Sequence, residues 1–101
     1  MVRTTINTLD HLDPSRPVTE TAEVVAGAVL RGLDSGGSVT VSVRGVRGVP
    51  SSFFNVILKA VQQHVGGRVD PARLGFEFDS KLQEMIYQRS LDAVNAQAGR
   101  G

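Results

Sequence analysis

Two adjacent serines, Ser51 and Ser52, precede a segment with helical spacing, and they are the residues of this chain best placed to do chemistry. The first backbone N–H groups of a helix have no partner within the helix. A serine at this position can accept a hydrogen bond from them as an N-cap, which stabilises a helix by about 1 kcal/mol. A phosphoryl group on the same hydroxyl would lie at the positive helix end, near Arg44 and Arg47 in the sequence, and would make a neutral surface dianionic. The local features favour the N-cap interpretation.

Other residue types that carry chemistry lack the partners that their chemistry needs. His11 and His64 are the two histidines, and neither has metal-ligand spacing from another histidine or from a carboxylate cluster. Gly45 and Gly48 precede the serines, but the lysine of a phosphate-binding loop is missing, so we expect these glycines in tight turns. A hydrolase would also need a base oriented beside its serine. We therefore predict no catalytic residue, no metal and no cofactor, and a protein that is not an enzyme.

Length and charge restrict the class of protein further. The chain has 101 residues, a net charge of +1 and no cysteine. One domain is expected at this length, and such a weak charge does not favour nucleic acid or anionic lipid as a partner. The segment 1–9 is polar rather than a signal peptide, and no apolar run reaches the length of a membrane span. We expect a cytoplasmic protein with one domain over residues 1–97 and a flexible tail at 98–101.

Alternating and helical hydrophobic patterns follow one another along the chain and predict three strands and three helices. The expected strands are 2–8, 38–44 and 74–78, and the expected helices are 19–35, with Thr19 as its cap, 51–65 and 80–96. This order predicts an α/β fold with a mixed or mainly parallel sheet of 3–4 strands. Because each strand also has a polar face, the helices should gather mostly on one side, in two layers.

The helical wheels divide core from surface. In the second helix, Phe54 and the residues in phase with it should be buried, whereas Phe53 should be half-exposed. The outward residues form a candidate partner surface around the serine turn: Arg47, Pro50, Ser51, Ser52, Phe53, Asn55, Val56 and Lys59. In the last helix we expect Leu82, Met85, Ile86 and Ala93 to face inward. A second stripe, Tyr87, Leu91 and Val94, is either further core or a contact in a homodimer.

The stretch 39–58 resembles STAS domains, the fold of bacterial anti-sigma-factor antagonists, and it is most similar to the STAS-like branch of unknown function. In the antagonists, an apolar strand leads through a loop and an Asp-Ser-Ser-Gly-like turn into a helix, and here the turn reads Val49-Pro50-Ser51-Ser52-Phe53. The STAS-like branch also has a Ser-Phe pair opening this helix and a later helix start similar to that at 78–86. The resemblance covers about residues 18–90.

The resemblance implies a signalling role and a kind of partner. Ser51 matches the serine that is phosphorylated in the antagonists, and members of the STAS-like branch are often joined to, or encoded beside, an ATPase of the histidine-kinase type. Pro50 stands where the antagonists usually carry an acidic residue, and Phe53 stands where they carry a glycine. These differences favour binding to a protein partner, such as that ATPase or an anti-sigma factor, over phosphorylation. The alternative is a structural domain that only forms homo-oligomers.

Overall fold

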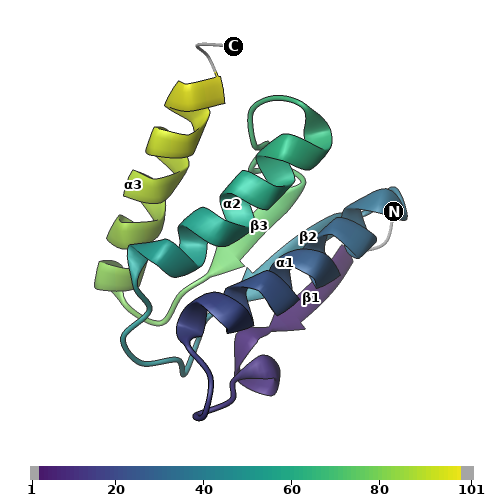
Figure 1. Cartoon of the computed structure of the whole chain (residues 1–101). Coiled ribbons are helices and arrows are strands. Elements are labelled where there is room, and N and C mark those ends of the chain that lie inside the picture. The colour runs from purple at the N-terminus through teal and green to yellow at the C-terminus, as the bar shows by residue number, and fades with distance from the viewer. Residues whose placement is uncertain (1–2, 99–101) are drawn as a thin grey trace.

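The computed structural model describes residues 3–98 and has an α/β fold in which strands and α-helices alternate along the chain (Figure 1). The strands are β1 (Arg3–Asn7), β2 (Ser38–Ser42) and β3 (Leu74–Glu77), and the α-helices are α1 (Val18–Asp34), α2 (Ser51–Val65) and α3 (Lys81–Ala98). A short 3-10 helix, η1 (Thr8–His11), follows β1. The predicted order of elements is confirmed.

The sheet is parallel throughout, with strand order β1-β2-β3. In its register Val41 lies between Ile6 of β1 and Phe76 of β3. Figure 1 shows α1 in front of β1 and β2, and α2 in front of β3, so the helices cover one face of the sheet. On the other face, Thr40 lies between Thr5 and Gly75. The polar face that the alternation predicts is therefore the face without helices.

The core lies between the sheet and the helices. Val39 and Val41 of β2 are fully buried beneath buried residues of α1 and α2. Aliphatic side chains fill the centre, and the aromatic rings gather at one edge. These rings are Phe53, Phe54, Phe76, Phe78 and Tyr87, with neighbouring centroids 4.6 to 6.4 Å apart.

Several expected boundaries are wrong by one or two residues: β1 ends at Asn7, β3 ends at Glu77, α1 ends at Asp34 and α3 begins at Lys81. Helix α1 begins at Val18, and its N-cap is Pro17, which has extended backbone and makes no side-chain cap bond, so Thr19 lies inside the helix and is not its cap. Strand β2 ends at Ser42 rather than at Arg44. The chain turns there because Gly45 has a φ of +81° and its N–H donates to Asp79 at 2.7 Å. Helix α3 continues to Ala98, and the remainder of the expected tail, 99–101, lies outside the described residues.

The expected inward face of α3 is also wrong in part. Leu82 and Met85 are 67% and 54% exposed, whereas Tyr87, Leu91 and Val94 are buried. Tyr87 packs against Phe76 of β3 and against Phe78, which follows the strand, and these contacts fix the rotation of the helix. Of the two alternatives for that stripe, the core is correct, so its three side chains are not available on the surface of this chain.

Within residues 3–98, none of the helices combines the length and the apolar character that crossing a bilayer requires.

Candidate binding groove between α2 and α3

The two serines lie inside the first turn of α2 and are not its cap. Pro50 is the N-cap, with φ −81° and ψ 163°, and it makes no side-chain cap bond. Its carbonyl accepts the N–H of Phe53 at 3.1 Å and so starts the helix. Ser51 and Ser52 follow as the first two helical residues, and both are exposed. The N-cap interpretation is therefore wrong, and both serines are displayed at the surface.

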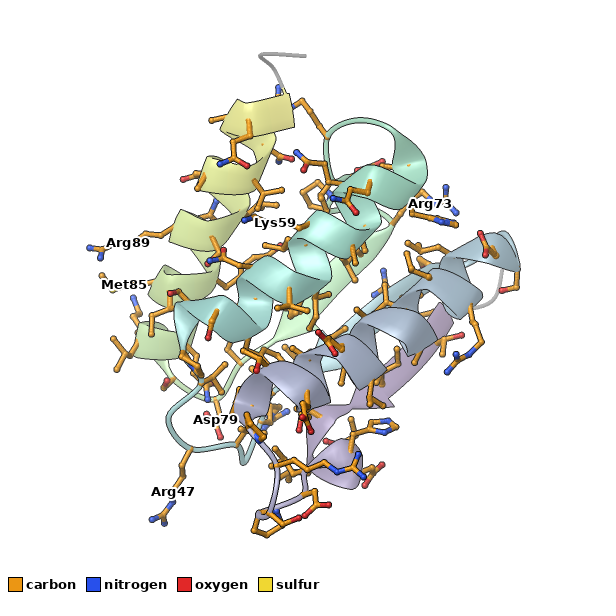
Figure 2. All side chains as sticks on the ribbon, viewed as in Figure 1. Arg47, Lys59, Arg73, Asp79, Met85 and Arg89 are labelled. Carbon is orange, nitrogen blue, oxygen red and sulfur yellow. The ribbon has the colours of Figure 1, made fainter. Side chains whose placement is uncertain are left out.

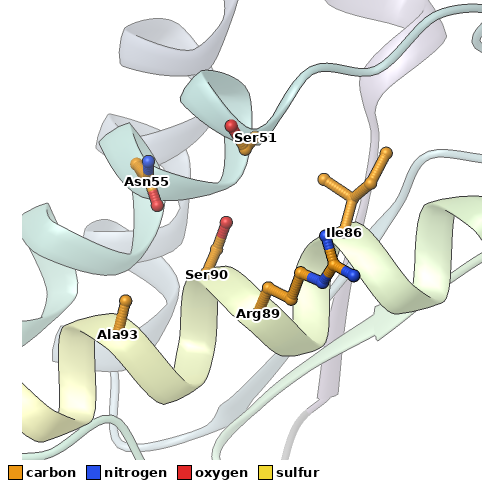
Figure 3. A pocket seen from close by; sticks show the side chains of 6 residues that line it. All are labelled: Ser51, Asn55, Ile86, Arg89, Ser90 and Ala93. Carbon is orange, nitrogen blue, oxygen red and sulfur yellow. The ribbon is translucent and has the colours of Figure 1, made fainter.

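Ser51 lies on the rim of a groove between α2 and α3 with a volume of about 400 Å³. Its lining residues are Ser51 and Asn55 from α2, and Ile86, Arg89, Ser90 and Ala93 from α3. Figure 3 shows the Ser90 side chain pointing from α3 toward Ser51 and Asn55. Ser90 is only 4% exposed, so its hydroxyl lies at the floor of the groove.

The groove has a positive bias. Arg89 is the single charged residue among its lining residues, and the first turn of α2 contains no acidic residue. The unpaired N–H groups and the macrodipole at the start of α2 add partial positive charge beside Ser51. Hydroxyls and an amide can donate or accept hydrogen bonds. This arrangement can bind an anionic or polar group, whereas none of the lining residues is a histidine or a carboxylate that could act as a general base.

The other residues of the expected partner surface do not all lie together. Figure 2 shows the Arg47 side chain projecting outward from its loop, away from the helices. Lys59 lies on the exposed side of α2 and Val56 is half-buried. Phe53 is 2% exposed and packs edge-to-face on Phe54, so it belongs to the core and not to the surface. The half-exposed position that we expected for Phe53 is therefore wrong.

Four residues of the groove, all from α3, were assigned no surface role by the sequence. Ile86 and Ala93 share the helical phase of Leu82, and this pattern placed them in the core. Ser90 carried no signal, because a single serine between Arg89 and Leu91 is compatible with either face of a helix. Arg89 could have been assigned to the groove only from knowledge of the residues that lie across the groove from it.

His64 and the loop glycines have structural surroundings. The Nε2 of His64 lies 2.6 Å from Oδ1 of Asp34 and connects the last turn of α2 to the last residue of α1. Gly45 and Gly48 have φ values of +81° and +63°, which confirms the prediction of tight turns. Among the residues that the structure describes, no group of three histidine or carboxylate side chains is arranged to hold a metal ion.

Comparisons with protein-family models, with curated proteins and with solved structures returned no match. The similarity to STAS-like domains accordingly rests on the residues of the turn and the helix starts quoted above.

Proposed function

We propose that this chain is a non-enzymatic protein-interaction module of a bacterial, cytoplasmic signalling circuit, with the start of α2 and the groove beside it as the contact surface. The observation that carries this proposal is the position of Ser51. Ser51 is exposed, does not serve as a cap, and lines the same groove as Asn55 and Ser90. A surface that combines hydrogen-bonding groups with one arginine suits recognition better than catalysis.

The charge of the groove favours a partner that presents an acidic side chain. Arg89 and the positive end of α2 would both attract a carboxylate, and the hydroxyl of Ser90 would donate a hydrogen bond to it. Ser52, Lys59 and Val56 would border the contact on the exposed side of α2. A kinase-like ATPase or an anti-sigma factor is the partner that the resemblance implies.

Phosphorylation of Ser51 would act as a switch on this contact. A phosphoryl group on Ser51 would place a dianion at the rim of the groove, where it would pair with Arg89 and repel an acidic partner. Because Phe53 lies in the core, it does not crowd the serine, and Pro50 is the one local feature that disfavours approach of a kinase. Phosphorylation would therefore release an acidic partner.

Site-specific photo-crosslinking in cells tests the contact surface. A crosslinking residue at Asn55 should capture one protein, whereas the same residue at Glu23, exposed on α1, should not. In a binding titration with that purified protein, Ser51→Glu should weaken the complex about tenfold and Ser51→Ala should leave it near wild type. Equal capture at both positions, or an unchanged affinity for Ser51→Glu, would overturn the proposal.

The phosphorylation step has its own test. The captured protein, if it carries an ATPase domain, should transfer phosphate to wild-type chain and not to Ser51→Ala when ATP is added. Equal labelling of the two chains would remove Ser51 from the switch and leave the contact surface intact.

A further inference from the structure

The outer face of α3 carries apolar side chains that the fold itself does not cover. Leu82 and Met85 are 67% and 54% exposed, more than any other large hydrophobic residue described as exposed. Figure 2 shows Met85 and Arg89 projecting outward from α3, and Arg89 is also one of the residues that line the groove. Large side chains that repeat along one helix face in water usually have a partner.

The residues on this face have the spacing of a helix-pairing seam. Leu82, Met85, Arg89, Asp92 and Ala96 are separated by steps of three, four, three and four, and all five are exposed. This is the a/d spacing with which two helices pack side by side. We call these five residues the α3 seam.

The α3 seam is complementary to itself when two copies run antiparallel. In the register with a two-fold axis between Ser90 and Leu91, Arg89 lies opposite Asp92 of the second copy, and Met85 lies opposite Ala96 of the second copy. Ile86 then flanks Ala93 of the second copy. Each contact occurs twice by symmetry, so Met85 meets a small side chain and each arginine meets a carboxylate. Leu82 lies opposite position 99, which is outside the described residues.

Other arrangements place incompatible residues opposite one another. A parallel pair would set Arg89 against Arg89 and Asp92 against Asp92, and like charges across a helix interface repel. An antiparallel pair shifted by one heptad would set Leu82 against Asp92 and Met85 against Arg89, which would leave both charges without a partner. The charges of the α3 seam therefore select one arrangement.

The position of Asp92 within its own helix is compatible with this pairing. Gln88 donates a hydrogen bond from Nε2 to Oδ1 of Asp92 at 3.2 Å, which orients the carboxylate along the exposed face. Its other oxygen is left for an arginine. The guanidinium of Arg89 extends outward from α3 on the same face (Figure 2).

We propose that the α3 seam is the contact of a homodimer in which two copies of α3 pack antiparallel, with reciprocal Arg89–Asp92 ion pairs at its centre. This contact is separate from the stripe of Tyr87, Leu91 and Val94, which lies in the core. It is small and polar at its centre, so the dimer is weak and in exchange with monomer. Arg89, Ile86 and Ala93 also line the groove, so the second copy and the groove partner would compete for Arg89, whereas Ser51 and Asn55 lie outside the dimer contact.

Sedimentation equilibrium on the full chain, from about 10 µM to about 1 mM at low salt, tests the dimer. The wild-type mass should rise from monomer toward dimer with concentration. Met85→Glu should remain monomeric over this range. Val24→Glu, at an exposed apolar position on α1, is the matched control and should behave as wild type.

A charge exchange tests the register. Arg89→Glu and Asp92→Arg should each weaken the dimer about tenfold, because each places like charges together. The double variant Arg89→Glu/Asp92→Arg should recover an affinity within about threefold of wild type, since the ion pairs reform with reversed signs. Circular dichroism should show the same helix content for every variant.

A monomeric wild type at all concentrations would overturn the proposal, as would an effect of Val24→Glu equal to that of Met85→Glu. Failure of the double variant to recover would overturn the antiparallel register. Ser51→Glu should leave the mass unchanged, and Met85→Glu, at a position that does not line the groove, should not weaken partner binding. These two variants measure a loss of partner binding and a loss of the dimer independently.

Discussion

The Nε2 of Gln83 donates a hydrogen bond to the backbone carbonyl of Val46 at 2.9 Å and joins the start of α3 to the loop between β2 and α2. Its Oε1 accepts the N–H of Asp79 at 3.1 Å, and its own N–H donates to the hydroxyl of Ser80. One buried amide thus holds the loop that leads to Ser51 against the helix that supplies the other wall of the groove.

Gln83→Leu should lower the free energy of unfolding by about 1–3 kcal/mol. The substitution keeps the size of the side chain but leaves the Val46 carbonyl and the Asp79 N–H without these partners. Urea denaturation measures the change. Gln63→Leu, at an exposed position on α2, is the control and should stay within about 0.5 kcal/mol of wild type.

Gly32→Ala should destabilise the chain although alanine favours helices. A Cβ at Gly32 would lie 2.6 Å from Cγ2 of Val39, which is fully buried in β2 and has no room to move. The expected loss is about 1–3 kcal/mol from overpacking. Gly27→Ala on the same helix meets only the end of the Arg31 side chain at 3.7 Å, and it should stabilise the chain by about 0.5–1 kcal/mol. Equal effects of the two substitutions in thermal denaturation would contradict the close packing of α1 on β2.

Leu91→Ala and Leu82→Ala make the same change on opposite faces of α3. Leu91 is buried against α2 and the sheet, so its loss should cost about 2–5 kcal/mol. Leu82 is exposed, and its loss should cost less than about 0.5 kcal/mol at concentrations where the chain is monomeric. The reverse order of the two values in chemical denaturation would mean that α3 is rotated.

Thr40→Val should be neutral or should stabilise the chain by about 1 kcal/mol. The hydroxyl of Thr40 is buried in the sheet and has no hydrogen-bond partner among the described residues. Valine has the same shape and removes the cost of burying that hydroxyl. Thr5→Val, at the exposed register neighbour of Thr40, should change stability by less than about 0.5 kcal/mol. A loss of more than 1 kcal/mol for Thr40→Val would show that the hydroxyl is satisfied.

The wild-type chain should lose stability at alkaline pH through ionisation of Tyr87, and Tyr87→Phe should abolish that loss. Burial raises the pKa of the Tyr87 phenol in the folded chain above its ordinary value near 10. The folded state therefore binds this proton more tightly than the unfolded state does, so this contribution to stability is complete below about pH 10 and is lost as pH rises through the folded pKa. Unfolding free energies from pH 7 to 11 should diverge only at the alkaline end, with the phenylalanine variant the more stable. Parallel curves throughout would contradict the burial of the phenol.

The sequence by itself determined the order of the elements and most of their limits. Alternation in 38–42, helical spacing in 51–65 and the glycines at 66 and 67 are local signals, because backbone geometry and solvent exposure act over a few residues. The polar second face of the strands was enough to place the helices on one side of the sheet. Ser51 was found as an exposed residue at a helix start because proline and the apolar spacing fixed that start.

Only the tertiary structure decided which face of α3 is inside. Leu82 with Ile86, and Tyr87 with Leu91, both have helical spacing, so periodicity predicts two inward stripes and cannot choose between them. The choice depends on what lies across the interface, namely the Phe76 ring of β3 and the Val46 carbonyl that Gln83 reaches. The same rotation brings Arg89 and Ser90 beside Ser51 and leaves Met85 in water. Both proposed surfaces thus follow from contacts such as Tyr87 with Phe76, 11 residues away, and Gln83 with Val46, 37 residues away, and no local pattern contains them.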